Sequence, residues 1–271
     1  LAAADGGAPL PPNACILSFD DGFLDHYTNV FPRLHRRGWP GCFFPPARAV
    51  LEYKVLDVHK IHIILASTLD MDKLVARIFE CLSPFRQDFE IPPDAELYAK
   101  IAKPSRWDPP QIVFVKRTLQ RDLPEAVRGR IVDVLFADFV ADEAAFAKDY
   151  YMDLDQMRLM SSMGMEFGGH GFRHVWLGSL TPQEQREEIR LTVDFLNRIT
   201  GAPVRDWTMC YPYGNYNRTT LALLREVNCR IGLAAEVGEV KSLANLLELP
   251  RLNTNDLPFS GSAPPLARTT A

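Results

Sequence analysis

The chain carries the sequence Ala14-Cys15-Ile16-Leu17-Ser18-Phe19-Asp20-Asp21-Gly22 near its beginning. The first six residues form a short, largely apolar run, which is typical of a buried strand in a parallel sheet. Two carboxylates and a glycine end this run abruptly, which by itself is also typical of a simple turn. In parallel α/β folds, functional side chains gather at the carboxyl ends of strands. The stretch therefore predicts a parallel sheet with Asp20 and Asp21 at a candidate site.

Strand-like and helix-like segments alternate on both sides of a long central stretch. Helical spacing of apolar residues from Tyr27 to Leu34 predicts a helix that ends near Gly38, and Thr181-Pro182-Gln183-Glu184 is a capping box that predicts the start of another. A further helix is predicted around 221–227. Further strands are predicted over 41–44, 165–167, 207–211, 230–234 and 247–249. This order predicts an α/β fold whose parallel sheet is open or closed into a barrel.

The stretch from residue 51 to 150 does not follow the alternation. Apolar residues recur there at helical spacing, with proline pairs at 92–93 and 109–110. We expect a mainly helical insertion that caps one end of the sheet within a domain spanning 14–259, since long structureless loops are rare in compact domains. Residues 1–13 and 260–271 are predicted to be a mobile N-terminal arm and a C-terminal tail.

Composition excludes several classes of protein. Hydrophobic residues make up 47% and charged residues 24%, as in globular proteins, and the net charge of −4 indicates no nucleic-acid partner. No apolar run approaches the roughly 20 residues of a membrane span. Five scattered cysteines without a CxxC pair favour a reducing compartment, which predicts a cytoplasmic location. The chain does not begin with Met, so a removed leader stays open, as does the oligomeric state.

Two further polar clusters follow predicted strands. His170 and His174 lie four positions apart after Gly168-Gly169, so that both imidazoles can reach one metal ion. The cluster Tyr211-Pro212-Tyr213-Gly214 combines a rigid and a permissive residue, which can fix backbone N–H groups as an oxyanion hole. Each cluster alone is also compatible with surface histidines or an ordinary turn.

Together the clusters predict a metal site. Asp21, His170 and His174 supply one carboxylate and two imidazoles, a set that fits catalytic zinc with an open position and also a non-haem iron facial triad. The adjacent Asp20 favours hydrolysis, because an activated water needs a nearby base.

These residues resemble the polysaccharide deacetylase family (carbohydrate esterase family 4, with the nodulation-type chitooligosaccharide deacetylase homology domain). The resemblance covers about residues 14–45 and 160–258 and implies a distorted (β/α) barrel with fewer than eight strands. It implies that Asp20 is the base, that Asp21, His170 and His174 bind the metal, and that the N–H of Tyr213 stabilises the oxyanion. The implied reaction is hydrolysis of an N-acetyl group on a sugar or glycoconjugate.

The sequence departs from this family's pattern at three places. Gly171 replaces a Ser or Thr that steadies the histidine loop, and Cys210 replaces an Arg that orients the base. We expect Arg251, in Leu249-Pro250-Arg251, to pair with Asp20 in its place, because a guanidinium fixes and ionises a carboxylate whereas Cys210 does neither.

The third departure is that no histidine follows His174, so the proton donor is unassigned. Candidates are His59 and His62 of the insertion, which are otherwise helix-surface histidines, while His26 and His35 are expected to be solvated.

The leading hypothesis is a metal-dependent carbohydrate N-deacetylase, in which Asp20 deprotonates a water activated by a divalent metal ion, zinc by preference. Trp176, Phe172 and Tyr216 are candidates for stacking on sugar rings and equally for the core. The alternative is a carbohydrate-binding protein on the same barrel that has lost catalysis. An iron oxygenase would need a 2-oxo acid site, for which the sequence gives no support.

Overall fold

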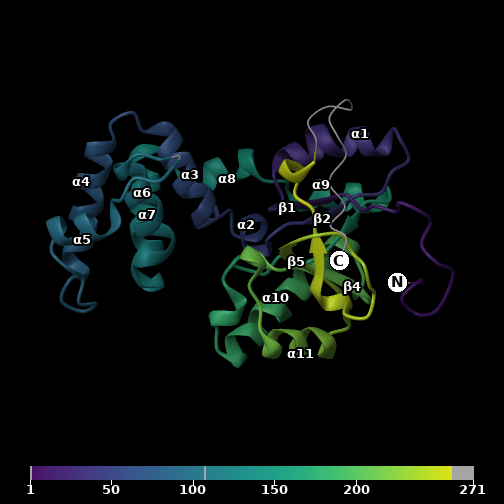
Figure 1. The fold of residues 1–271 in the computed structure, drawn as a ribbon. Coiled ribbons are helices and arrows are strands. Elements are labelled where there is room, and N and C mark those ends of the chain that lie inside the picture. The colour runs from purple at the N-terminus through teal and green to yellow at the C-terminus, as the bar shows by residue number, and fades with distance from the viewer. Residues whose placement is uncertain (1, 107, 258–271) are drawn as a thin grey trace. The chain divides into compact units, whose positions relative to one another are not determined.

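The computed structural model describes residues 2–106 and 108–257, which divide into two compact units. The site unit consists of residues 2–51 and 150–257, and the helical unit of residues 52–149 (Figure 1). The prediction of a C-terminal tail over 260–271 lies outside the described residues. Residues 2–13 form turns and no helix or strand.

Parallel strands form the centre of the site unit. In one sheet the order is β1-β2-β3, and in the other it is β4-β5-β6, with all pairs parallel. A parallel bridge between Gly169 and Met209 joins the sheets, so six strands follow one another in chain order. The strands are β1 Ser18–Asp20, β2 Cys42–Phe44, β3 Glu166–Phe167, β4 Trp207–Cys210, β5 Cys229–Val237 and β6 Leu249–Arg251. The predicted α/β fold with parallel strands is thus confirmed, while no backbone pairing between β6 and β1 closes a barrel within residues 2–106 and 108–257.

Helices of the site unit pack on these strands through one apolar core. The core includes Phe43, Met209, Phe195 and Leu224, all nearly or fully buried. The helices are α1 Phe31–His35, α2 Ala47–Leu51, α9 Leu154–Ser162, α10 Pro182–Thr200 and α11 Arg218–Glu226. Helices α10 and α11 lie side by side (Figure 1).

Local sequence signals set the ends of α10. The Thr181 side chain accepts a hydrogen bond from the N–H of Glu184 while Glu184 bonds back to Thr181, which is the predicted capping box. At its other end Gly201 adopts φ 73°, a left-handed conformation that glycine takes without strain.

Two strand predictions were wrong in extent. The first strand does not span 14–19 but begins at Ser18, and Ile16 is 75% exposed. The reason is that β1 pairs on one side only, with β2, and that pairing begins where the N–H of Cys42 donates to the carbonyl of Leu17. The segment 247–249 forms mostly a 3₁₀ turn over Leu246–Glu248, and β6 starts at Leu249.

The helical unit contains helices only, apart from turns and loops, among its described residues. The helices are α3 Asp57–Ser67, α4 Met71–Leu82, α5 Asp94–Ile101, α6 Pro110–Arg117, α7 Glu125–Phe139 and most of α8 Glu143–Tyr150. Ile61, Ile64, Leu74, Ile78 and Phe136 are buried together with other apolar residues as a core of this unit. The predicted helical character of the insertion is therefore present, whereas its role as a cap stays a prediction.

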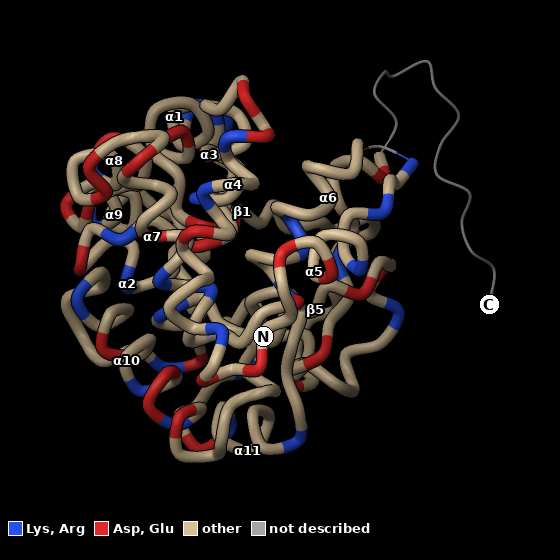
Figure 2. Tube along the Cα trace, turned by 90° about the vertical axis from the view of Figure 1, so that its left-hand side faces the viewer, with Lys and Arg blue, Asp and Glu red and all other residues tan. Residues whose placement is uncertain are grey.

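Three features of the described residues can be compared with the amino-acid composition: the distribution of charges, the apolar character of the helices and the state of the cysteines. Lys and Arg are interspersed with Asp and Glu along the drawn trace of both units (Figure 2). None of the helices formed by the described residues combines the length and the apolar character that crossing a bilayer requires. All five cysteine thiols are free.

Candidate active site

The candidate residues lie where the strands of the site unit end. Asp20 ends β1 and Asp21 follows it, His170 follows β3, Tyr213 follows β4, and Arg251 ends β6. Because all strands run parallel, their carboxyl ends meet at one edge of the sheets. Residues from four separate stretches of sequence are thereby brought together.

Asp21, His170 and His174 point one ligand atom each at a common position. The Oδ1 atom of Asp21 lies 3.5 Å from Nε2 of His170 and 3.6 Å from Nε2 of His174. Ligand atoms about 2.0–2.2 Å from a tetrahedral ion are about 3.3–3.6 Å apart. The two distances from Asp21 therefore fit a tetrahedral ion, and all three ligand atoms lie within 4.8 Å of one another.

The hydrogen bonding of His170 leaves the correct nitrogen for a metal. Its Nδ1 atom lies 2.8 Å from the backbone carbonyl of Cys210, which can only accept, so the proton is on Nδ1 and the lone pair is on Nε2. Burial pushes the pKa of His170 down, but its contacts with Cys210 and with the carboxylates of Asp21 and Asp20 outweigh burial and hold this pKa well above its usual value. An environment that attracts a proton so strongly also attracts a metal cation.

Asp20 is held by a two-pronged hydrogen bond. Nη1 and Nη2 of Arg251 donate to Oδ1 and Oδ2 of Asp20, each at 2.9 Å. Burial raises the pKa of Asp20, but the charge of His170 and the bonded guanidinium outweigh it and hold this pKa below its usual value. The Sγ atom of Cys210 also donates to Oδ2 of Asp20 at 3.4 Å. Asp20 is thus ionised and fixed in plane beside the candidate metal ligands.

Glu188 on α10 holds the loop between the two histidines, a contact that the sequence analysis did not find. Its Oε2 atom accepts from the N–H groups of Phe172 and Arg173 at 2.9 and 3.0 Å, and Oε1 accepts from Nε of Arg173 at 2.5 Å. Its side chain is 2% exposed. The sequence places Glu188 on the same helix face as Phe195, seven positions on, but gives no sign of its partners in the loop. Glu188 therefore fixes the loop between His170 and His174 through three hydrogen bonds.

The other side of this loop rests on α2. The carbonyls of Gly171 and Phe172 accept from the N–H groups of Ala47 and Arg48 at 3.3 and 2.9 Å. Donors at the beginning of a helix have no partner within the helix, so they are available to fix a loop. The His170–His174 loop is therefore held from both sides.

Three of the candidate residues adopt left-handed backbone conformations. Asp21, His174 and Tyr213 have φ angles of 71°, 58° and 56°, and they are three of eight such non-glycine residues in the described chain. This conformation is strained for a bulky residue such as Tyr213. Strain of this kind clusters at functional sites because the surrounding structure has to enforce it.

Aromatic rings extend the site outward from His174. The ring of Tyr213 lies 4.6 Å from the ring of His174, and Trp176 stacks on Tyr213 at 4.7 Å with 8° between the ring planes. Phe172 and Tyr216 pack against the core instead. Of the three candidates for sugar stacking, only Trp176 has a largely exposed ring.

The remaining histidines are not members of this cluster of candidate ligands. His59 is buried and His62 is exposed on α3 of the helical unit, so a role as proton donor stays a prediction for both. His35 is exposed as expected, but the expectation for His26 was wrong because only 8% of it is exposed. His26 packs against Phe19, Phe23 and Phe43, and this burial lowers its pKa.

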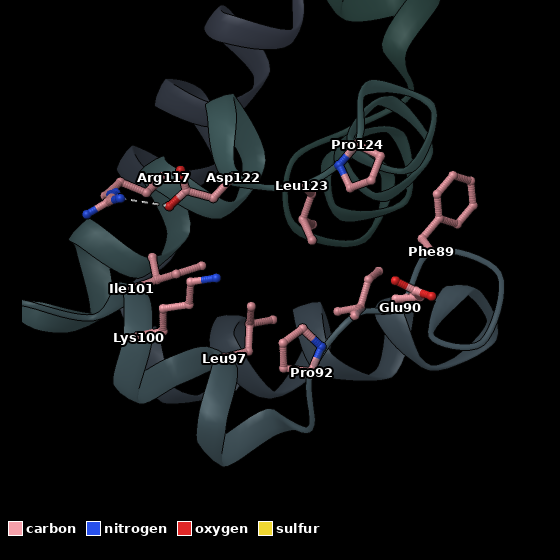
Figure 3. Close-up of a pocket in the computed structure, with 11 residues that line it drawn as sticks. Phe89, Glu90, Pro92, Leu97, Lys100, Ile101, Arg117, Asp122, Leu123 and Pro124 are labelled. Carbon is pink, nitrogen blue, oxygen red and sulfur yellow. Dashed lines mark ion pairs between the residues drawn. The ribbon is translucent and has the colours of Figure 1, made fainter.

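A separate hollow of about 460 Å³ lies in the helical unit. Figure 3 shows Leu97, Leu123 and Pro92 on its wall and an ion pair of 3.0 Å between Arg117 and Asp122 at one side. No residue predicted for catalysis or metal binding lines it.

Comparison with known proteins finds similarity to carbohydrate deacetylases. The model of the polysaccharide deacetylase family matches residues 131–232, which include both histidines and Tyr213. Forty residues are 50% identical to the poly-β-1,6-N-acetyl-D-glucosamine N-deacetylase of Escherichia coli (strain K12), and they make up 15% of this chain and 6% of that enzyme. The resemblance to the polysaccharide deacetylase family is thereby confirmed.

Solved structures share the fold. The deacetylase PplD of Streptococcus pyogenes, solved with acetate, has a TM-score of 0.50 and 17% identity, with 92% of this chain and 68% of PplD covered. The BpsB deacetylase domain of Bordetella bronchiseptica has a TM-score of 0.50 and 18% identity, with 92% and 74% covered. At these identities the likeness shows the fold alone.

Proposed function

We propose that the protein is a metal-dependent hydrolase that removes N-acetyl groups from amino sugars of a polysaccharide or glycoconjugate. The observation that carries this proposal is the convergence of Asp21, His170 and His174 next to an arginine-bound Asp20. The confirmed family resemblance supports the same reaction. A divalent metal ion, zinc by preference for this ligand set, supplies Lewis-acid activation of a water and of the amide carbonyl when bound.

The residues of the chain then have distinct tasks. Asp20 takes the proton of the attacking water, and Arg251 keeps Asp20 ionised and oriented for that step. The backbone N–H of Tyr213 binds the oxyanion that develops on the carbonyl oxygen. The leaving amine has to receive a proton, since an amide anion is a poor leaving group.

Acetate release from a panel of N-acetylglucosamine oligomers tests the proposal. We expect release by the metal-loaded protein, loss after treatment with a chelator, and recovery when zinc is returned. Metal content near one per chain should accompany activity and fall in a protein with both His170 and His174 changed to Ala. A protein that binds these oligomers and one metal ion without releasing acetate is instead the catalytically inactive binding protein.

A further inference from the structure

Trp176 and Tyr213 form a stacked pair that begins at the metal-ligand cluster and ends in solvent. Tyr213 contacts the ring of His174 at 4.6 Å, and Trp176 lies nearly parallel on Tyr213 at 4.7 Å. Trp176 is 47% exposed and Tyr213 is 40% exposed. Large aromatic rings usually contribute to a core, so two adjacent exposed rings beside a candidate active site need a functional explanation.

The pair is held rigidly by the loops that carry it. The carbonyl of Trp176 accepts from the N–H and the hydroxyl of Ser179 at 3.1 and 2.7 Å. Asn215 accepts from the N–H of Gly178 at 2.7 Å, and Asn217 donates to the Gly178 carbonyl at 3.0 Å. These bonds link the loop after His174 to the loop after β4. Because the stacked geometry forms within the protein itself, little ordering is required when a ligand binds.

The positions of Trp176 and Tyr213 relative to His174 indicate which sugar of an oligosaccharide would contact Trp176. Tyr213 contacts both His174 and Trp176, so a group that stacks on Trp176 lies one ring further from His174 than a group that contacts Tyr213. A pyranose ring presents a flat C–H face that matches an aromatic ring in size and in apolar character. A sugar on Trp176 is therefore a neighbour of the sugar that reacts.

We propose that Trp176, stacked on Tyr213, is a binding subsite for the sugar next to the one that is deacetylated. This inference rests on the proposed function and deepens it, because the subsite makes the protein favour N-acetylated oligosaccharides over single amino sugars. Trp176 determines specificity through binding and takes no part in the chemical step.

Kinetics with two substrates test the subsite in the zinc-loaded full chain. The substrates are N-acetylglucosamine and its β-1,6-linked pentasaccharide, and the variant is Trp176→Ala. We expect kcat/KM for the pentasaccharide to fall at least roughly tenfold, mainly through KM, with kcat/KM for the monosaccharide within about twofold. Equal losses for both substrates, or no loss for the pentasaccharide, would overturn the proposal.

Control variants separate stacking from folding. Trp39→Ala removes another exposed tryptophan, 54% exposed after α1, and should change neither substrate's kinetics. Trp176→Phe keeps a flat ring and should recover most of the pentasaccharide affinity, while metal content stays at the wild-type value. Failure of Trp176→Phe to recover more affinity than Trp176→Ala would contradict stacking.

Calorimetric binding distinguishes this inference from the proposed function. If Trp176→Ala weakens binding of the pentasaccharide, the subsite is supported, whether or not any substrate releases acetate. If no substrate releases acetate, the deacetylase proposal is rejected while the subsite stands. Acetate release with pentasaccharide binding unchanged by Trp176→Ala would reject the subsite and retain the deacetylase.

Discussion

The two units each contain a charged group that an oppositely charged partner from a distant segment holds in place. In the site unit, Arg251 binds both oxygens of Asp20, and the two side chains are 25% and 28% exposed. In the helical unit, Lys60 is 3% exposed and pairs with Asp133 and, at 2.6 Å, with Glu143, which also binds Lys54 at 2.7 Å. The first pair lies beside metal ligands and strained backbone, whereas the second links helices.

This difference indicates that the groups around an ion pair decide whether the pair affects catalysis or stability. The side chain of Asp20 is 28% exposed, so solvent can reach its charge. Lys60 lies on α3 and contacts Asp133 of α7 and Glu143 of α8, and its own charge would be costly to bury without these carboxylates. We therefore expect changes at Asp20 and Arg251 to affect rate, and changes at Lys60 to affect stability.

The largest effect is expected for Asp20→Asn. An amide cannot accept the proton of the attacking water, so kcat should fall by about 10²–10⁴-fold. Acetate release and metal content measured on the same sample check this. Asp133→Asn, which changes a carboxylate of the other network, should leave kcat near the wild-type value. Full activity of Asp20→Asn would remove Asp20 from the role of base.

Lys60→Ala should lower the stability of the helical unit. Breaking a buried ion pair commonly lowers the free energy of unfolding by about 3–5 kcal/mol. A loss of about 3 kcal/mol is expected here, because Glu143 still pairs with Lys54 after Lys60 is removed. Faster amide hydrogen exchange in α3 and α7, with exchange in α10 unchanged, is the measurement. Asp133→Ala removes a half-exposed partner and should cost less than about 1 kcal/mol. Equal losses for the two variants would contradict the distinction between enclosed and exposed partners.

Arg251→Ala should reduce kcat by about 10²-fold while metal content stays at one per chain. The guanidinium helps to lower the pKa of Asp20, so the base is ionised below the pH range of an ordinary carboxyl. Its removal raises this pKa, and the acidic limb of the kcat/KM profile should move to higher pH. Arg251→Lys keeps the positive charge but not the two-pronged hydrogen bond. Its acidic limb should therefore lie close to that of the wild type, whereas its kcat should stay low. An unshifted acidic limb would exclude an effect through Asp20.

Glu188→Gln is expected to have the smallest effect, a loss of about 10–100-fold in metal affinity. Gln retains one acceptor for the loop N–H groups but loses the charged contact with Arg173, so the histidines are held less firmly. Zinc titration against a chelator of known affinity measures this directly. Glu187→Gln, one residue earlier and exposed, is the matched control. Zinc affinity that is equal in both variants would show that Glu188 does not position the ligands.

Much of the site could be predicted from sequence because its residues follow recognisable strands. The ligand types of Asp21, His170 and His174 and the turn residues around Tyr213 are local features. Glu188 could not be found in this way, because its partners at 172 and 173 lie on another element. The extent of β1 was overestimated for a similar reason: an apolar run becomes a strand only where a neighbour pairs with it.

The sequence by itself determined the alternation of helices and parallel strands, the capping of α10 and the kinds of ligand at the strand ends, because each depends on residues close together in the chain. Tertiary structure alone decided that Arg251 reaches Asp20 across 231 positions, that Glu188 supports the histidine loop, and that Trp176 is exposed while Tyr216 is packed. The physical reason is that hydrogen-bond partners and burial are properties of neighbours in space, and packing brings those neighbours together from segments whose local sequences carry no record of one another.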